Sequence, residues 1–436
     1  MNEQAPGRRD RTDLATRSPG DGVRFAEFDA LRGTAIVLVV TLHSALAYTR
    51  FDIPRLLWGV REPSGHVGLD LFCWWSMGVS VPLFFAISGF FAAAVEGARG
   101  PSEFLKGRFR RVVVPALASG PILLPLCFFA WSLGWLSTDR CTVNEFRRMR
   151  FLDPRIMGEL YGPAHLWFLE YLIPMFGAFW AIRARDKSRR PALPGGWLLR
   201  WWSPMALAVP AAVLLMASRE ISGIDAGLDR HNSFIPGPIR LVYYGMFFAF
   251  GVGAHRDRGR LDALIGRGWW YLAASVPVFG VRAWLLPLDW SRPLAEPWSL
   301  VMAASGGLFT WLTLFGLIGV YRRHLAGPSE MARYLAGASF WLYLVHLPIV
   351  GLVQLDLLRV AIPTVAKFGL VWGFTMGLGL ASYHVFVRRT ALGRFLGSRG
   401  PAAVVEGRAD RAGGAIRPSR PEPRIGRSAR QRRQPA

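Results

Sequence analysis

The stretch DALRGTAIVLVVTLHSALAY places an arginine and a histidine in an otherwise apolar run. Arg32 and His43 are eleven residues apart, so on a helix they share one face within about 20° and lie about 16 Å apart along the axis. Imidazole is suited to general base chemistry near neutral pH, and guanidinium is suited to binding phosphate. Ionisable groups inside a membrane helix are costly and are usually functional. The alternatives are a snorkelling anchor for Arg32 and a helix-packing hydrogen bond for His43.

Further basic residues gather where the third apolar run begins, in FLKGRFRRVVVPALA. Lys106, Arg108, Arg110 and Arg111 would by default anchor the helix at the membrane surface. Arg108 and Arg111 could instead join Arg32 in an anion pocket, because guanidinium groups make bidentate contacts with phosphate.

A second intramembrane histidine occurs in the ninth apolar run, FWLYLVHLP. His346 lies about nine residues into this run, and His43 is placed near the middle of the bilayer, so the two are expected at similar depth. Histidines at one depth on different helices predict a shared polar cavity, whereas a lone histidine would more often belong to the core.

Two other motifs carry polar residues within apolar runs. In VPLFFAISGFFAAAV, Ser88 and Gly89 are small and favour close helix packing, with substrate contact by Ser88 as the alternative. In GPAHLWFLEYLIPMF, His165 and Trp167 stand at the predicted outer end of the helix. Glu170 lies further in, where a carboxylate needs a partner. His165, Trp167 and Glu170 are candidate substrate-binding residues.

The elements that must position these residues are membrane helices. Of the 436 residues 52% are hydrophobic, and long uncharged runs recur along the chain. This composition is typical of an all-α polytopic membrane bundle. We predict about ten spans, at 28–48, 78–95, 112–134, 165–182, 202–218, 239–254, 269–287, 298–321, 337–355 and 363–387. The apolar stretch 66–77 is expected to be interfacial.

Charge distribution predicts the orientation of these spans. With both termini in the cytosol, the cytosolic segments contain 36 Lys and Arg and the outer loops contain 12. The predicted domains are a disordered cytoplasmic arm at 1–24, a membrane core at 25–387, and a basic disordered tail at 388–436. Thirteen arginines and three acids lie in that tail, out of a net charge of +23, which favours attraction to anionic lipid over nucleic-acid binding.

Cysteine usage gives no sign of a metal site. Cys73, Cys127 and Cys141 lack metal-ligand spacing, and we expect no metal. Cys73 and Cys141 could pair on an oxidising side, but free thiols are the preferred interpretation.

Five motifs in order resemble the acyltransferase-3 family of integral-membrane acyltransferases. They are FDALRGTAIVLVVTLH, LFFAISGFF, RFRRVVVP, HLWFLEYL and FWLYLVHLP, and together they cover about residues 25–387. The HLWFL form is similar to the branch that contains periplasmic-glucan succinyltransferases. The resemblance implies an acyl-CoA donor in the cytosol, an acceptor hydroxyl on a sugar or glycan reached from the other side, and a location in the cytoplasmic membrane.

The resemblance also suggests residue roles. His43 would be the general base or a transient acyl carrier, two roles that the sequence does not separate. Arg32 would hold donor phosphate or developing negative charge, with Arg108 and Arg111 beside the donor. Tyr343 or His346 would donate to the thioester oxyanion. Acetyl and succinyl are the expected acyl groups, as in O-acetylation of cell-envelope carbohydrate.

Two other classes of protein would share some of these features. A transporter or flippase for a glycolipid would also have polar groups near the midplane, although the chain shows no internal inverted repeat. A sensor or scaffold would depend on the basic tail, so removal of residues 388–436 would abolish its function.

Overall fold

The computed structural model describes most of residues 25–396. The described ranges are 25–54, 56–185, 198–222, 232–327 and 329–396. The predicted arm at 1–24 and most of the predicted tail at 388–436 lie outside these ranges.

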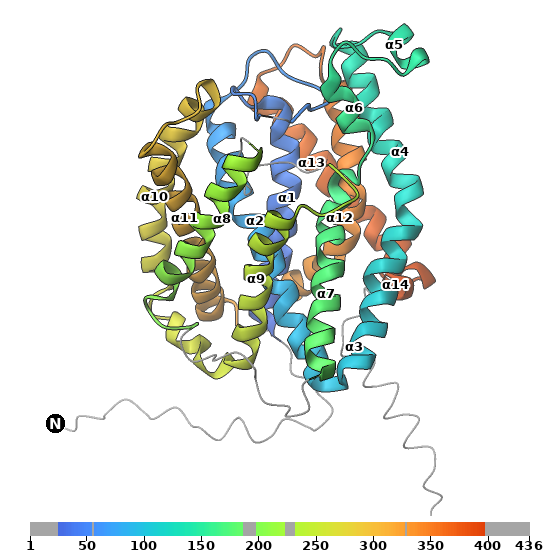
Figure 1. The fold of residues 1–436 in the computed structure, drawn as a ribbon. Helices are drawn as coiled ribbons and strands as arrows, with labels where there is room; N and C mark the ends of the chain where they lie inside the picture. Colours follow the sequence, from blue (N-terminus) through green and yellow to red (C-terminus); the bar gives the residue numbers. More distant parts are fainter. Residues whose placement is uncertain (1–24, 55, 186–197, 223–231, 328, 397–436) are drawn as a thin grey trace, which may run out of the picture. The chain divides into compact units, whose positions relative to one another are not determined.

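Within the described residues every regular element is a helix, and no strand occurs (Figure 1). The α-helices are α1 Ala26–Ala45, α2 Val67–Arg99, α3 Pro101–Arg108, α4 Val114–Ser137, α5 Val143–Arg148, α6 Pro154–Leu160, α7 Trp167–Arg185, α8 Ser203–Ser222, α9 Pro238–Arg256, α10 Gly268–Ser291, α11 Trp298–His324, α12 Glu330–Asp356, α13 Thr364–Ser382 and α14 Ala391–Phe395. The 3₁₀ turns are η2 Leu46–Tyr48, η4 Ala164–Leu166 and η6 Arg258–Leu264, and the π-helical turns are η3 Phe109–Val113 and η7 Tyr383–Val387.

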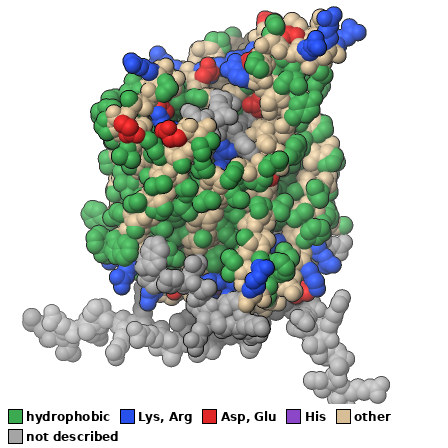
Figure 2. Space-filling model, in the orientation of Figure 1, with side chains coloured by type: hydrophobic (Ala, Val, Ile, Leu, Met, Phe, Trp, Pro, Cys, Tyr) green, Lys and Arg blue, Asp and Glu red, His purple; other side chains and the backbone are tan. Residues whose placement is uncertain are grey.

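The all-α membrane bundle predicted from composition is confirmed. In the described part of the chain, nine helical segments are long and apolar enough to cross a bilayer. The one predicted span outside this set, 239–254, corresponds to α9. This helix has 19 residues, and Arg240, His255 and Arg256 make it less apolar than the other nine. Figure 2 shows hydrophobic side chains over the middle of the visible face, with Lys and Arg gathered near the two ends. The chain is therefore a multi-pass membrane protein.

The stretch 66–77 is not a separate segment, and its interfacial location stays a prediction. These residues continue without a break into α2, and the His66 ring accepts a hydrogen bond from the Gly68 N–H (3.1 Å) at its start. Pro82 is accommodated within the same helix. At 1.5 Å per residue a helix of 33 residues is about 50 Å long, which exceeds the roughly 30 Å of hydrocarbon.

The basic motif of the third span lies at a local widening of the helix. Between α3 and α4 the chain makes one π-helical turn, in which the Val114 N–H bonds to the Phe109 carbonyl. Pro115 lacks the N–H that a regular α-helix would direct to the Arg111 carbonyl. Single π-helical turns within helices are frequently found at functional sites.

Helix α1 is largely enclosed by the bundle, and it packs against α2, α11, α12 and α13. The neighbouring α2 and α9 approach each other at glycines. A Cβ on Gly89 would lie 2.0 Å from the Phe248 carbonyl oxygen, and one on Gly251 would lie 1.9 Å from that of Ala86. The close helix packing predicted for the Ser88–Gly89 motif is thus confirmed at Gly89.

Contacts between helix ends define two ends of the bundle. The Thr34 and Tyr321 hydroxyls lie 2.6 Å apart, so the start of α1 is beside the end of α11. The Thr364 hydroxyl donates to the Ser64 carbonyl (2.8 Å), so the start of α13 is beside the segment that follows α1. We call the end where α1 begins the Arg32 end and the opposite one the His43 end. Assignment of the Arg32 end to the cytosol stays a prediction.

The segment between α1 and α2, residues 49–66, folds back over the last turn of α1. The Glu62 N–H bonds to the Ala47 carbonyl (2.8 Å). The fully buried Asp70 carboxylate accepts from the backbone N–H groups of Arg50 (2.9 Å) and Phe51 (3.0 Å). These bonds fix the segment to the bundle and place its side chains above His43.

Candidate active site

His43 and His346 face each other from α1 and α12. His346 Nε2 lies 3.2 Å from His43 Nδ1, and the ring centroids are 4.9 Å apart. His346 is fully buried, whereas His43 is partly exposed. The two histidines predicted to lie at similar depth are in contact, and the polar cavity predicted between them stays a prediction. His43 lies in the last turn of α1, and its predicted depth near the middle of the bilayer stays a prediction.

Backbone carbonyls define which ring nitrogens carry hydrogen. His346 Nδ1 lies 3.0 Å from the Leu342 oxygen and 2.9 Å from the Tyr343 oxygen, and carbonyl oxygens only accept, so Nδ1 is protonated. In neutral His346 the Nε2 lone pair then accepts from the Nδ1–H of His43. His43 Nδ1 also lies 2.9 Å from the Val39 carbonyl. His43 is thereby held in the tautomer whose Nε2 carries the lone pair.

His165 is the third histidine of this group. Its ring centroid lies 5.3 Å from that of His346, its Nε2 donates to the Leu344 carbonyl (3.0 Å), and Cys127 Sγ lies 3.9 Å from its Nδ1. The side chain is buried inside the bundle. The three cysteines of the chain are free thiols, as preferred from the sequence.

The hydrogen-bond donors of Tyr343 and His346 are engaged with the backbone. The Tyr343 hydroxyl donates to the His165 carbonyl at 2.5 Å, and the His346 Nδ1–H is directed at the two carbonyls already described. The geometry supports a positioning role for both side chains rather than the predicted contact with an oxyanion.

Sequence reasoning missed two residues that complete the arrangement. The buried Gln354 amide donates to the carbonyls of His43 (3.2 Å) and Ser44 (3.2 Å), which lie at the end of α1. Its oxygen accepts from the Trp58 indole N–H (2.7 Å), and the Trp58 ring stacks 5.9 Å from the His43 ring. An amide two turns beyond His346 in an apolar helix was a usable signal for Gln354, whereas nothing in the sequence marks Trp58.

The predicted cation group lies at the opposite end of α1. Arg32 donates to the Ala336 carbonyl, and its Nε is buried without a hydrogen-bond partner. Arg108 donates to the Phe91 carbonyl (3.1 Å) and lies within electrostatic range of Arg32 and Arg111. Among the described residues none of the three arginines forms an ion pair. The predicted grouping of the arginines is confirmed, and it is separated from His43 by about 16 Å of helix.

The remaining candidate residues lie apart from the histidines. Ser88 is on α2 beside the packing glycine, and Trp167 packs against Tyr171 and Tyr244 with ring centroids 5.6 and 5.7 Å away. Both carboxylate oxygens of Glu170 are buried without a hydrogen bond, and the nearest cation that acts on them is Arg240. The structure therefore does not bring Ser88, Trp167 or Glu170 to His43.

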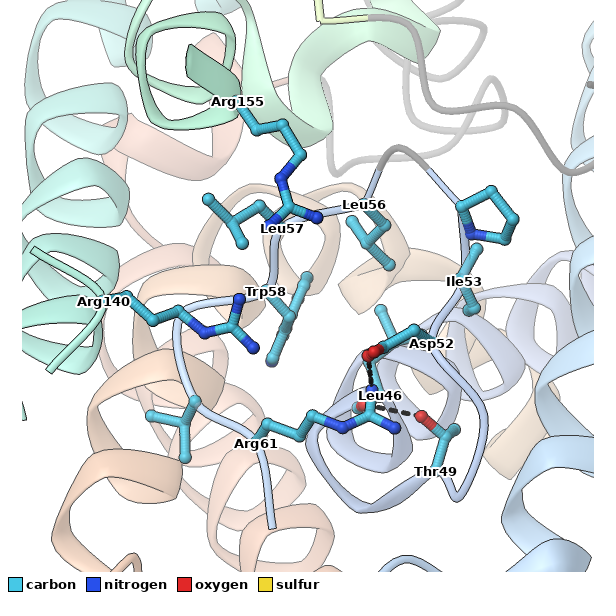
Figure 3. A pocket seen from close by; sticks show the side chains of 12 residues that line it. Leu46, Thr49, Asp52, Ile53, Leu56, Leu57, Trp58, Arg61, Arg140 and Arg155 are labelled. Atoms are coloured by element: carbon cyan, nitrogen blue, oxygen red, sulfur yellow. Dashed lines mark hydrogen bonds and ion pairs between the residues drawn. The ribbon is translucent and has the colours of Figure 1, made fainter. Parts of the chain in front are cut away.

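A cavity of about 160 Å³ opens at the His43 end and is shown in Figure 3. Trp58 lines this cavity on one side and stacks on His43 on the other. Trp58 therefore separates the cavity from His43.

Comparison with known proteins gives a family for this arrangement. The family model described as an acyltransferase domain, of the acyltransferase-3 type, matches residues 25–385. The chain belongs to the acyltransferase-3 family. As an acyltransferase-3 protein it is a membrane acyltransferase, which favours the enzyme over the transporter and scaffold alternatives.

Relatives of this acyltransferase-3 chain extend over most of its length. It is 24% identical over 406 residues to the protein named Glucans biosynthesis protein C of Salmonella schwarzengrund, covering 87% of this chain and 96% of the relative. The proteins of the same name from Salmonella typhi and Salmonella typhimurium are also 24% identical, with the same coverage. No solved structure matches the chain.

Proposed function

We propose that this membrane acyltransferase moves an acyl group from acyl-CoA at the Arg32 end to a hydroxyl of a sugar or glycan at the His43 end. The donor would come from the cytosol, and both chain termini would be cytosolic in the cytoplasmic membrane. The positive bias of the predicted cytosolic segments supports this orientation.

The observation that carries the proposal is the contact between His43 Nδ1 and His346 Nε2. With Nδ1–H directed at His346, His43 Nε2 takes the proton of the acceptor hydroxyl while the hydroxyl oxygen attacks the thioester carbonyl. The carbon–sulfur bond then breaks, and the departing thiolate of CoA receives the proton from His43. His346 stabilises the imidazolium that exists between these two proton transfers.

A transient acyl-histidine is the second route for the same residue. His43 Nε2 would attack the thioester, release the thiol of CoA, and pass the acyl group to the hydroxyl in a second step. Incubation with labelled acyl-CoA and no acceptor separates the routes, because only the second route leaves label on the protein.

Binding of the donor is the role that we propose for Arg32, Arg108 and Arg111. Among the described residues these arginines form no ion pair, although the Asp29 carboxylate acts on Arg32, and all three are partly buried. The phosphates of CoA would supply the missing negative charge. CoA carries its thiol at the end of a long flexible arm, which suits the distance between these arginines and His43.

A glucan or related glycan is the proposed acceptor, because the relatives are named for glucan biosynthesis. Acetyl and succinyl remain the proposed acyl groups. The basic tail would contact anionic lipid. No metal enters the proposed reaction.

The test is transfer across vesicles that contain the purified protein. Radiolabelled succinyl-CoA or acetyl-CoA is supplied on one side and a glucan oligosaccharide on the other. The proposal predicts labelled oligosaccharide only when the donor is on the side of the Arg32 end. Transfer with donor and acceptor both confined to the His43 end would contradict it.

A further inference from the structure

Three arginines from separate segments meet around the cavity at the His43 end. Arg61 belongs to the segment after α1, Arg140 to the turn after α4, and Arg155 to the start of α6. Figure 3 shows the three side chains extending toward the same space, with the Arg140 guanidinium beside the indole of Trp58. The space lies on the side of the bundle opposite to the arginines proposed to bind the donor.

Two of these arginines are already balanced by acids. Arg61 pairs with Asp52, and Arg155 pairs with Asp153 through its Nε (2.9 Å) and its NH2 (2.7 Å). The Arg155 guanidinium holds the pKa of the Asp153 carboxyl below its usual range, which keeps this pair charged. Arg61 and Arg155 thus contribute polarity to the cavity without much net charge.

Arg140 is different from the other two. Its side chain makes no hydrogen bond or ion pair with any residue that the structure describes, and it is partly buried at the cavity wall. A partly buried guanidinium can donate two parallel hydrogen bonds to one ligand. It therefore favours a carboxylate or a phosphate as its partner. The described residues thus place three arginines against the carboxylates of Asp52 and Asp153, and Arg140, whose charge also acts on Asp153, has no ion pair of its own among them.

Much of the remaining lining is apolar, and one lining residue, Trp58, stacks on His43. Leu46, Leu56, Leu57 and Trp58 line the cavity. An indole and aliphatic side chains beside a fixed charge are typical of a small-molecule site in which a few polar groups orient the ligand. The ring centroids of Trp58 and His43 are 5.9 Å apart, so a sugar ring packed on the cavity side of Trp58 would be separated from His43 by the indole alone.

We propose that this cavity is the acceptor subsite and that Arg140 binds an oxyanion, a carboxylate or a phosphate ester, carried by the acceptor glycan. The inference rests on the proposed function and adds that the acceptor is anionic. Binding of the oxyanion at Arg140 directs a hydroxyl of the same glycan past Trp58 toward His43.

Direct binding tests the subsite without depending on catalysis. Glucuronate, glucose 6-phosphate and glucose are titrated against the full chain in nanodiscs of phosphatidylcholine. We expect both anions to bind at least about tenfold more tightly than glucose, because a charge-assisted bidentate contact contributes about 1.5–3 kcal/mol. Equal binding of the three sugars would overturn the proposal.

Variants locate the binding. Arg140→Gln is expected to lose the preference for the anions, and Arg140→Lys, which keeps the charge without the fork, to keep part of it. Arg148→Gln is the matched control, since Arg148 is exposed on the neighbouring α5 and does not line the cavity. Anion binding that survives Arg140→Gln, or is lost equally in Arg148→Gln, would reject Arg140 as the contact.

A lipid headgroup is the other source of an oxyanion near this surface. Nanodiscs containing phosphatidylglycerol are compared with those of phosphatidylcholine alone. If phosphatidylglycerol abolishes the binding of glucuronate, the occupant is a lipid and the acceptor assignment is wrong. Persistence of glucuronate binding supports the acceptor. Failure of acyl transfer in the vesicle assay would reject the proposed function and leave these binding results unchanged.

Discussion

His346 Nε2 lies 3.2 Å from His43 Nδ1, at the point where α12 crosses the last turn of α1. Two backbone carbonyls keep the other nitrogen of His346 protonated, so His346 faces His43 as a hydrogen-bond acceptor. A buried acceptor in this position both orients the His43 ring and stabilises its protonated form. The relationship gives His346 a function without requiring it to touch the substrate.

Removal of the His346 ring takes this acceptor away from His43. His346→Ala should lower kcat by about 10²-fold or more, in line with the usual contribution of acid–base catalysis, and leave the KM of both substrates nearly unchanged. His346→Gln offers an amide oxygen in place of Nε2 and should recover part of kcat. The measurement is steady-state transfer by the purified variants. A His346→Ala enzyme with normal kcat would remove His346 from the mechanism.

Gln354 should matter for both stability and activity. Gln354→Ala leaves two carbonyls at the end of α1 and the Trp58 indole without their partner, at a cost of about 1–3 kcal/mol. We expect a lower melting temperature and reduced kcat. Thr313→Ala is the control, since it also removes a buried polar group that bonds within its own helix, away from the histidines. Equal loss of activity in both variants would show that Gln354 has no specific part in the site.

The arginines at the other end should act on the donor alone. Arg32→Gln and Arg108→Gln are expected to raise the KM for acyl-CoA about tenfold or more each, because each removes a charge-assisted contact with phosphate. With acyl-pantetheine, which lacks the phosphates of CoA, the variants should equal the wild-type enzyme. Lys106→Gln, at an exposed residue paired with Glu103, is the control. A similar defect with acyl-pantetheine would mean that these arginines serve the fold instead.

Close packing between α2 and α9 predicts a large effect from one methyl group. Gly89→Ala places its Cβ 2.0 Å from the Phe248 carbonyl oxygen, so the helices must separate, at a cost of about 1–3 kcal/mol or more. Gly97→Ala, in the same helix, meets nothing within 4 Å and should be tolerated. Thermal unfolding in detergent measures both. Equal melting temperatures would contradict the packing.

Apolar runs were enough to predict the all-α membrane bundle, whereas the orientation inferred from the charge pattern stays a prediction. Each predicted span corresponds to a long helix, because runs of this length have few alternatives in a bilayer. The continuity of residues 66–77 with the second span was not predicted, because span length was judged against bilayer thickness, and α2 is longer than that thickness requires.

The candidate site was predictable in part. Helical spacing and depth identified His43 and His346, since an imidazole in an apolar run stands out from its neighbours. The role of Trp58 could not be predicted, because a tryptophan in a loop has no periodic pattern. Its position depends on how the segment after α1 folds back onto that helix. Hydrogen bonds to the backbone, such as that of Tyr343, likewise follow from tertiary packing alone.

The most direct test of the central claim is the rate at which vesicle-held protein transfers the acyl group when His43 is replaced by Ala. His384→Ala is the matched control, since His384 is exposed near the end of the last long helix. With folding matched by melting temperature, we predict a loss of at least about 100-fold in His43→Ala and none in His384→Ala. A His43→Ala enzyme that keeps more than about a tenth of the wild-type rate would contradict the assignment of His43 as the reacting residue.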